Sequence, residues 1–550
     1  MKDNSNLRVI LAVAFSFLFI VIYSRYLAPQ TPEKQENTQT KIQENNAPKI
    51  TTTTQEIQNK APVSNISNQK IIAVVQSKDF EIQIDSLGRI HQVYLKDKKY
   101  TGAPELGFFE HFKVLFGMME EPKSLEKLPL LDPDALKPLE IRFSNENINQ
   151  EAFSRDYEAS QQEIFIDGEP KTLVLTQKLQ NLELKKTITF YENLKYDLKI
   201  TMSNPKESYF ITNGSRPVTD RENYAFNGVI LQTAEEKIEK IEDKDAKKVI
   251  SFDSVKFIAS VDRYYTSLFY LQNQDLHAMI DGDKNKNPMP YIHASGDIAF
   301  GGFIGPKDYQ ELKKIDANLI NVVEYGLITF FAKPVFLLLE FLHQYLANWG
   351  WAIIVLTIIV KIILYPLSYK GMVSMQKLKD LTPKMKEIQE KYKNDPQKLQ
   401  SHMMQLYKKH GANPMGGCLP LLIQIPIFYA IYRVLYNSVE LKSAPFIFWI
   451  NDLSVMDPFF VLPILMGVSM YIQQLLTPSG LSDPMQAKIF RMLPVVFTIF
   501  LIFFPAGLVL YWTINNILSI FQQLSINKML DRQKAKEIAE HKEKKSSVKK

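Results

Sequence analysis

The stretch WGWAIIVLTIIVKIILYPL, residues 349–367, decides the fold class of this chain, and its one charged residue is Lys361. At about 1.5 Å per helical residue, the stretch is long enough to cross the hydrocarbon core of a bilayer, which is about 30 Å thick. A lysine inside a membrane costs about 3 kcal/mol on insertion scales, so it usually faces protein or a water-filled cavity. The alternative is snorkelling, because Lys361 lies about 18 Å from Trp349 and its stem can extend to the nearer membrane surface.

Apolar runs long enough to cross a membrane recur later in the chain. The further expected spans are residues 418–435, 459–476, 490–504 and 508–526. Only Pro505, Ala506 and Gly507 separate the last two, which predicts a tight antiparallel helix pair. Together with 349–367, these runs predict a five-span helical core over residues 348–526.

Residues 1–27 contain another apolar run, which follows Lys2 and Arg8. The run resembles a secretory signal, but the YSRYLAPQ sequence at its end lacks a small-residue cleavage pattern. We therefore expect an uncleaved transmembrane anchor, which brings the number of spans to six. Residues 28–69 are rich in Thr, Gln, Asn, Lys and Pro, cannot bury enough apolar surface to fold, and are expected to form a disordered polar tether.

Residues 70–324 carry short runs in which apolar and polar residues alternate, such as DFEIQIDS, KKTITFY and YDLKITM. Alternation with a period of two between turn residues is typical of antiparallel strands, and the number of runs predicts a β-sandwich. The only cysteine of the chain, Cys418, lies outside this region. Such a domain would therefore fold without a disulfide.

Residues 325–347 form an apolar run that differs from the expected spans. Lys333, Glu340 and Gln344 recur at intervals of seven and four residues, which places polar groups on one helical face and apolar groups on the other. Pro334 would also disturb a straight membrane-spanning helix. We expect an amphipathic helix that lies in the membrane interface.

The distribution of charge predicts the orientation in the membrane. Residues 370–409 carry ten lysines and four acidic residues, and the tail, residues 527–550, carries nine Lys or Arg and four acidic residues. Basic segments next to spans stay in the cytoplasm, and the same rule places the N-terminus there. Six spans return the C-terminus to that side and place the β-rich domain on the outer side.

The cytoplasmic segment, residues 370–410, has its own helical pattern. Its apolar residues at helical spacing are Met375, Leu378, Met385, Ile388 and Tyr392 in the first arm, and Leu399, Met403 and Leu406 in the second. Asp395 followed by Pro396 is a helix start between the two arms. We predict a helical hairpin, with a solvated spacer as the alternative.

Several polar residues interrupt the expected spans. Thr357 and Lys361 lie four residues apart on one helical face, and Trp512, Asn515, Asn516 and Ser519 share a face of the last span. We expect Lys361, Gln424 and Asn515 to line a wet cavity, although hydrogen bonding between helices is the alternative. That alternative is favoured for Gln473, Gln474, Gln522 and Gln523. Arg433 lies near an outer span end, where snorkelling suffices, and receives no role.

Known hydrolytic and nucleotide-binding motifs are absent from the sequence. It contains no HExxH, GxSxG or GxxxxGK[ST] motif and no Cys/His set at ligand spacing, so we assign no catalytic residue, metal or cofactor. The spans contain no paired carboxylates, which weighs against a proton-coupled transporter. Two other classes remain open, namely an ion- or solute-conducting protein and an envelope enzyme whose β-rich domain processes carbohydrate.

Four strings carry a family resemblance. In order along the chain they are NPMGGCLPLLIQIPIF (413–428), DPFFVLPILMG (457–467), DPMQAKIF (483–490) and FFPAGLVLYW (503–512). Their order and spacing resemble the YidC membrane protein insertase family over about residues 325–530. The anchor, tether and β-rich domain are arranged as in its Gram-negative members, whose periplasmic domain is a β-sandwich.

The resemblance implies an inner-membrane insertase and chaperone, not an enzyme, that accepts nascent membrane proteins alone or beside the Sec translocon. It also implies a hydrophilic, lipid-open groove, and partners that include membrane lipids and the ribosome, which would bind the cytoplasmic hairpin and basic tail. Thr357, Gln424 and Asn515 match groove-facing positions, and Trp512 matches a substrate-contacting aromatic. Lys361 matches a position that is usually arginine, and unlike arginine a desolvated lysine can lose its proton.

Overall fold

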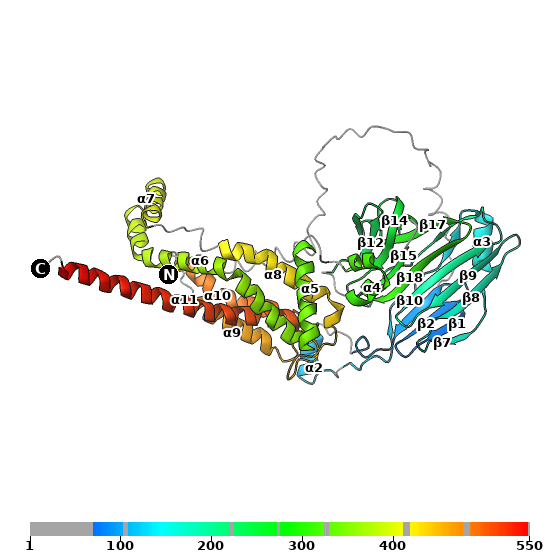
Figure 1. Cartoon of the computed structure of the whole chain (residues 1–550), viewed down its shortest axis with the longest axis horizontal. Coiled ribbons are helices and arrows are strands. Elements are labelled where there is room, and N and C mark those ends of the chain that lie inside the picture. The colour runs from blue at the N-terminus through cyan, green and yellow to red at the C-terminus, as the bar shows by residue number, and fades with distance from the viewer. Residues whose placement is uncertain are drawn as a thin grey trace, which may run out of the picture.

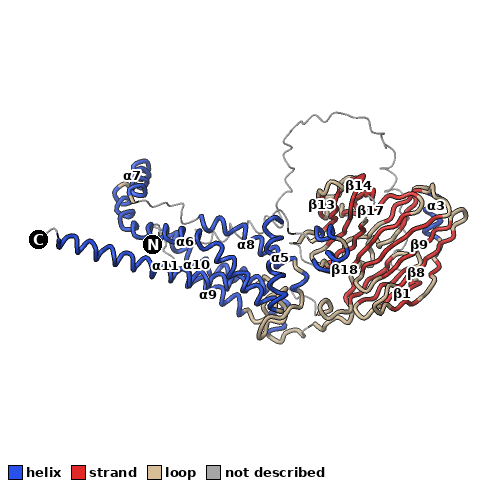
Figure 2. Tube along the Cα trace, viewed as in Figure 1, coloured by secondary structure: helices blue, strands red, loops and turns tan. Residues whose placement is uncertain are grey.

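The computed structural model of this chain describes residues 70–102, 108–120, 122–219, 225–271, 276–323, 325, 329–410, 419–476 and 484–547. The predicted anchor, the predicted tether, residues 411–417 and Cys418 lie outside these residues. The described chain forms a strand-rich body and a helical body that follow one another along the long axis (Figures 1 and 2). The sequence division near residue 325 separates them.

Two sheets build the strand-rich body. The smaller sheet has the order β4 (Leu128–Pro129), β3 (Ile90–Leu95), β2 (Phe80–Asp85), β1 (Ile71–Gln76), β7 (Glu163–Phe165). The main path of the thirteen-stranded sheet is β5 (Ile141–Phe143), β11 (Ser208–Ile211), β17 (Pro288–Ser295), β16 (Leu276–Gly282), β14 (Ile250–Val261), β15 (Tyr265–Tyr270), β18 (Ile298–Pro306), β10 (Lys195–Met202), β9 (Glu183–Phe190), β8 (Lys171–Lys178), β6 (Glu158–Ala159). Beside this path, β12 (Gly228–Thr233) pairs with β14 and with β13 (Ile238–Glu242).

The alternating sequence pattern explains how the sheets pack. In β8, β9 and β10 every second side chain is buried, and Leu198 of β10 pairs with Ile188 of β9 in an antiparallel register. Val75 and Ile84 of the smaller sheet share one hydrophobic core with Ile188 of the larger sheet. Two sheets thus enclose a common core, but one pairing, β1 with β7, is parallel and departs from the antiparallel arrangement we predicted. A parallel pair needs a long connection, and here the chain passes through five other strands between β1 and β7.

Buried charges join the two sheets at the β2–β3 turn. Arg89 lies 2.8 Å from the carboxylates of both Asp85 and Glu140. The fully buried Lys186 donates to the carbonyl oxygens of Gly88 and Leu139, each at 2.8 Å, and burial lowers its pKa to about 7. Sequence patterning did not predict this cluster, because lysine and arginine on a strand are usually solvent-exposed.

The helix α5 (Thr329–Leu346) connects the two bodies and has two apolar faces. Ala332, Phe336 and Leu339 are buried against the protein. Phe330 and Tyr345 lie on the exposed side together with other large apolar residues, and the Phe330 side chain is 83% exposed. In Figure 1, α5 runs across the long axis, whereas α8, α9, α10 and α11 run along it.

In the described part of the chain, six α-helices form the rest of the helical body. They are α6 (Trp349–Lys391), α7 (Pro396–Lys409), α8 (Leu419–Asn437), α9 (Val461–Leu476), α10 (Pro484–Leu501) and α11 (Ala506–Ser547). Asn348 caps α6 by accepting a hydrogen bond from the Trp351 backbone at 3.1 Å. Both α6 and α11 continue well beyond the expected spans, so the first hairpin arm and much of the basic tail are helical extensions of them.

The helices α9, α10 and α11 pack together. We predicted that the last two spans form a tight antiparallel pair; the rings of Phe497 on α10 and Trp512 on α11 lie 5.5 Å apart, and α9 packs against both helices. Gly467 of α9 has no room for a side chain beside Thr498 of α10, so the two helices approach closely there. The first turn of α11 is held by the loop between α8 and α9, since the Gly507 backbone donates to the Leu453 carbonyl at 2.9 Å.

Polar contacts fasten the strand-rich body onto the end of α8 and onto the loop after it. Arg263, in the β14–β15 turn, donates to the Tyr436 carbonyl at 2.9 Å and lies 4.0 Å from the Tyr436 ring. The Ser443 hydroxyl donates to the Lys99 carbonyl at 2.9 Å. The backbone of Tyr309, at the start of α4 (Tyr309–Ile315), donates to the Glu440 carboxylate at 3.1 Å. These contacts fix the orientation of the two bodies.

One of these contacts predicts a pH dependence. Burial, and next the negative charge of Asp308, raise the pKa of Glu440 to about 7. A raised carboxyl pKa means that the folded state binds the proton more tightly, so this stabilisation is present at acid pH and is lost as pH rises through about 7. We expect Glu440→Gln to raise the melting temperature at about pH 8 and to flatten its decline between about pH 5 and about pH 8.

The measurement is thermal unfolding of the full chain in detergent across that pH range. Glu158→Gln, an exposed carboxylate on β6, is the matched control and should follow the wild type. A Glu440→Gln curve parallel to the wild-type curve would show that Glu440 stays ionised in the folded protein.

Candidate functional site

The candidate site is a polar cluster where α6, α8 and α11 meet. The Lys361 ammonium on α6 donates to the Ser519 hydroxyl on α11 at 2.7 Å. On α8, the Gln424 amide donates to the side-chain oxygen of Asn515 at 3.3 Å. The Ser519 hydroxyl also donates to the Asn515 carbonyl at 2.8 Å, which links the two contacts along α11. We call Lys361, Gln424, Asn515 and Ser519 the polar cluster.

The structure therefore brings together three of the residues that the sequence singled out. Lys361 is half-buried and bonds to a residue on another helix of the core. The sequence placed Ser519 on the same helical face as Asn515 but did not identify it as the hydrogen-bond partner of Lys361. A hydroxyl one turn from an amide in a membrane helix offers a lysine an acceptor.

Thr357 lies one helical turn before Lys361 but makes a different contact. Its side chain is buried, and its hydroxyl donates to the Ile353 carbonyl of the same helix at 2.7 Å. This local bond satisfies the hydroxyl proton within α6. Thr357 thus stands next to the polar cluster without a hydrogen bond to it in the described contacts.

Trp512, one turn before Asn515 on α11, belongs to a cluster of aromatic side chains. Its ring lies 4.5 Å from Phe428 of α8 and 5.5 Å from Phe497 of α10, measured between ring centroids. The side chain is half-buried, so part of the indole stays accessible. The position combines a broad apolar surface with one hydrogen-bond donor, which suits contact with varied polypeptide segments.

The neighbouring Asn516 serves a different purpose. Its amide donates to the Ser469 hydroxyl at 3.3 Å and lies 3.5 Å from the Met466 carbonyl, so it joins α11 to α9. We expected Asn515 and Asn516 to share one helical face, but they contact different helices. Consecutive helical residues point about 100° apart, which explains the division.

Arg433 corrects another prediction. Its side chain is only 9% exposed, and it donates to the Tyr325 carbonyl at 3.3 Å instead of extending to the membrane surface. Tyr325 immediately precedes the segment that leads into α5. Arg433 therefore helps to hold the α5 region against α8, a structural task that sequence spacing alone did not predict.

The outward faces of the helices are apolar. One helix of the described chain, α6, contains an 18-residue window with a mean hydropathy of 2.2, long enough to cross a membrane, and α9 and Arg491–Leu501 are shorter apolar helices. Large apolar side chains exposed on four helices include Ile362, Ile363, Ile464, Leu465, Val468, Ile472, Leu475, Val495, Val496, Ile499, Phe521 and Leu524. Exposed apolar surface of this extent indicates contact with lipid or protein.

A cavity lies away from the polar cluster. It has a volume of about 230 Å³ and is lined by residues of β13, α4, η3 (Ala317–Val322) and α5, among them Lys240, Tyr309 and Lys333. Among the described residues, no group of three or more His, Cys, Asp or Glu side chains is placed to hold a metal ion. The hydrophilic groove suggested by the sequence stays a prediction.

Comparison with known proteins covers both bodies. The family model of the 60Kd inner membrane protein matches residues 341–534, and the model of the YidC periplasmic domain matches residues 120–338. Membrane protein insertase YidC of Helicobacter pylori strain 26695 is 56% identical over 541 residues, 97% of this chain and 98% of the relative. Its namesake in Wolinella succinogenes is 50% identical over 539 residues, 97% of each chain.

Among solved structures, an active YidC insertase with its first transmembrane domain resolved matches 83% of this chain and 94% of its own. Its identity is 19% and the TM-score is 0.36, so the family assignment rests on the sequence relatives. Those relatives match almost the whole chain, and the two family models account for the strand-rich body and the helical body separately. The chain therefore belongs to the YidC family of membrane protein insertases.

Proposed function

We propose that this chain inserts nascent membrane proteins into the bacterial inner membrane and assists their folding. Relatives that are half identical or more over nearly the whole length are named membrane protein insertases. The observation that carries the proposal is the polar cluster around Lys361, set among helices whose outward faces are apolar. Such a core would offer an inserting polypeptide polar contacts inside the protein and apolar helix faces that lead to lipid.

The physical problem of insertion is the transfer of a polar segment across hydrocarbon. Each unsatisfied backbone or side-chain polar group costs several kcal/mol there. Hydrogen-bonding groups at Lys361, Gln424 and Asn515 would replace part of the lost hydration and shorten the dry distance. Lys361 would attract acidic residues of the translocated segment. Trp512 would contact the apolar part of the substrate, and Thr357, one turn before Lys361 on α6, would line the same groove.

Release of the substrate needs no nucleotide. A hydrophobic segment gains about 0.8 kcal/mol for each CH₂ that leaves water for lipid. If the polar cluster belongs to a groove open to lipid, the segment can leave sideways once its polar end has crossed. This thermodynamic argument supports a carrier without a catalytic centre.

For the topology we propose six spans with both termini in the cytoplasm, as the charge distribution predicts. Residues 1–27 would be the anchor, 28–69 the tether, 70–324 the periplasmic domain, 325–347 an interfacial helix and 348–526 the five-span core. The two apolar faces of α5 support its interfacial position, because one packs on protein and the other is left for lipid.

The cytoplasmic side would receive substrates. The hairpin, residues 370–410, packs through Leu378, Leu381 and Met385 against residues of α7. We propose that this hairpin and the basic tail, residues 527–550, approach the ribosome, because lysine clusters bind phosphate backbones. Positive-inside sorting also accounts for these charges. The Sec translocon is a further proposed partner, and membrane lipids are another.

A crosslinking experiment tests the proposed function. A photoreactive amino acid at position 512 should crosslink to ribosome-bound nascent membrane proteins, because Trp512 flanks the polar cluster. The same probe at Phe521, an exposed apolar position two to three turns later on α11, should crosslink mainly to lipid. Equal substrate crosslinking at both positions, or none at 512 with normal insertion, would contradict the assigned path.

A further inference from the structure

The helix α2 (Phe108–Leu115) belongs to an arm of the strand-rich body that packs little against the other described residues. We call residues 108–120 together with 122–125 the α2 arm. Its base is closed by a backbone hydrogen bond, in which Leu125 donates to the Thr101 carbonyl at 3.0 Å. The chain therefore leaves the strand-rich body at Thr101 and returns beside Thr101 at Leu125.

The α2 arm exposes large apolar side chains. Phe112, Phe116 and Met118 are 41%, 59% and 70% exposed, and Leu115 and Leu125 are exposed as well. The rings of Phe112 and Phe116 lie 4.4 Å apart and form one apolar ridge. Exposed apolar area costs about 25 cal/mol per Å² in water, so a cluster of this kind indicates a surface that is covered in the working protein.

The base of the arm lies at the outer end of the helical body. The Ser443 hydroxyl, in the loop after α8, donates to the Lys99 carbonyl two residues before Thr101. Gly102 lies directly beside the same serine side chain. The arm therefore starts where the expected spans end on the periplasmic side.

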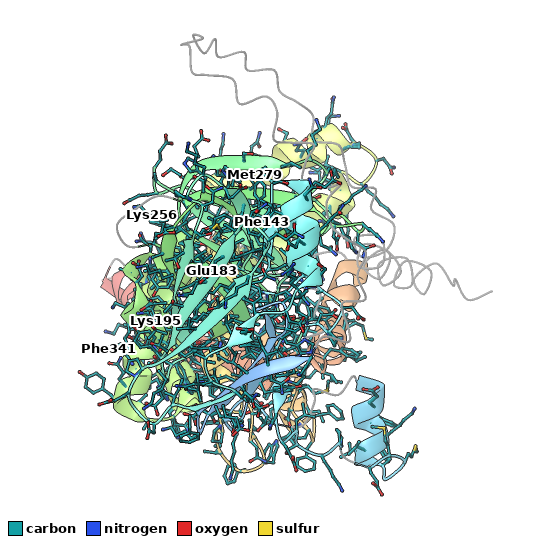
Figure 3. The ribbon with its side chains drawn as sticks, turned by 90° about the vertical axis from the view of Figure 1, so that its right-hand side faces the viewer. Phe143, Glu183, Lys195, Lys256, Met279 and Phe341 are labelled. Carbon is teal, nitrogen blue, oxygen red and sulfur yellow. The ribbon has the colours of Figure 1, made fainter. Side chains whose placement is uncertain are left out.

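The figures place the arm relative to the proposed membrane. In Figure 1, α2 lies at the same level along the long axis as α5. Figure 3 looks along that axis from the strand-rich end, and α2, in light blue, projects sideways at the lower right, whereas Phe341 of α5 lies at the left. A segment at the level of the interfacial helix and outside the helical body would rest over lipid.

We propose that the α2 arm is a second interfacial element, which inserts the ridge of Phe112, Phe116 and Met118 into the outer leaflet. This inference rests on the proposed membrane placement of the helical core. Aromatic and apolar side chains at the boundary of headgroups and acyl chains anchor peripheral segments, and Lys113 beside the ridge suits lipid phosphates. With α5 on the other side, the arm would hold the periplasmic domain to the bilayer at two separated points.

Spin-label accessibility tests this proposal on the full chain in vesicles of phosphatidylethanolamine and phosphatidylglycerol. Cys418→Ala removes the only cysteine, and single cysteines then carry a nitroxide at positions 116, 118, 165 or 468. We expect labels at 116 and 118 to be more accessible to oxygen than to a water-soluble nickel complex. Phe165, which is 60% exposed on β7, should show the reverse ratio.

The lipid-facing reference is Val468 on α9, an exposed residue of the proposed core. A water-like ratio at 116 and 118 with a lipid-like ratio at 468 would overturn the arm proposal alone. A water-like ratio at 468 as well would overturn the membrane placement of the core. Low accessibility to both reagents at 116 would mean that protein, not lipid, covers the ridge, and would also overturn the proposal.

A second variant distinguishes burial of the ridge in lipid from local misfolding of the arm. Phe112→Asp, combined with the label at 118, should reverse the oxygen-to-nickel ratio, because a carboxylate opposes burial in the acyl region. Thermal unfolding of the strand-rich body should not change, since Phe112 is exposed. An unchanged ratio at 118 would show that the ridge does not act as one lipid-bound surface.

Discussion

Lys361→Glu should reduce insertion of substrates with acidic translocated segments by about tenfold or more. At an effective dielectric constant of about 20, two unit charges about 8 Å apart interact with about 2 kcal/mol. Replacing lysine with glutamate turns an attraction of that size into a repulsion, and about 1.4 kcal/mol corresponds to a factor of ten in rate. The expected loss is therefore among the largest for a single substitution in this chain.

Three companion variants separate charge from structure. Lys361→Arg should preserve insertion, because guanidinium keeps the charge and can still donate to the Ser519 hydroxyl. Lys361→Met removes the charge at similar length and should cause an intermediate loss. Lys206→Glu makes the same charge change at an exposed position of the strand-rich body and should have little effect.

The measurement is protease protection of a translocated segment in reconstituted vesicles, with protein levels matched. Substrates with neutral translocated segments should be affected much less by Lys361→Glu than acidic ones. Equal insertion of the acidic substrate by the wild type and Lys361→Glu would exclude the electrostatic role of Lys361.

Deleting residues 375–406 should abolish insertion while leaving the helical core assembled. The arms of the hairpin pack on each other through Leu378, Leu381 and Met385, and the Tyr407 hydroxyl lies 4.0 Å from the Met385 sulfur. The Asp395 side chain caps α7 by accepting from the Lys398 backbone at 3.1 Å. The hairpin is thus a folded unit of its own, and its loss should remove the proposed receiving site for cytoplasmic partners.

Point variants give the matched control for this deletion. Leu378→Asp buries a carboxylate between the arms and should lower insertion severalfold, whereas Met404→Asp, at an exposed position of α7, should not. In the Cys418→Ala background, a disulfide between cysteines at positions 385 and 403 should be tolerated, because it joins arms that already pack together. Full insertion after the deletion, at normal protein levels, would reduce the hairpin to a spacer.

The local features of this chain followed directly from the sequence. Alternating residues marked β8, β9 and β10, and the Asp395–Pro396 pair marked the start of α7. Apolar runs marked the helices of the core. Each of these signals depends on residues a few positions apart, and hydrogen bonding and burial act on them within one strand or one helical turn.

Contacts between elements were harder to predict. The sequence placed Asn515 and Asn516 on one face, yet Asn515 meets Gln424 of α8 and Asn516 meets Ser469 of α9. It assigned Arg433 to the membrane surface, yet the side chain is buried and bonds to Tyr325. It paired the last two spans with each other but did not predict that both pack on α9.

The sequence by itself determined the family, the division into a strand-rich part and a helical part, and the presence of Lys361 in an apolar helix. Only the tertiary structure decided that Lys361 bonds to Ser519, that Glu440 and Arg263 fasten the two bodies together, and that the α2 arm is left exposed. Periodicity records which face of an element is apolar. The rotation, depth and neighbours of that face depend on how all the helices and strands pack at once, and a linear pattern does not contain that information.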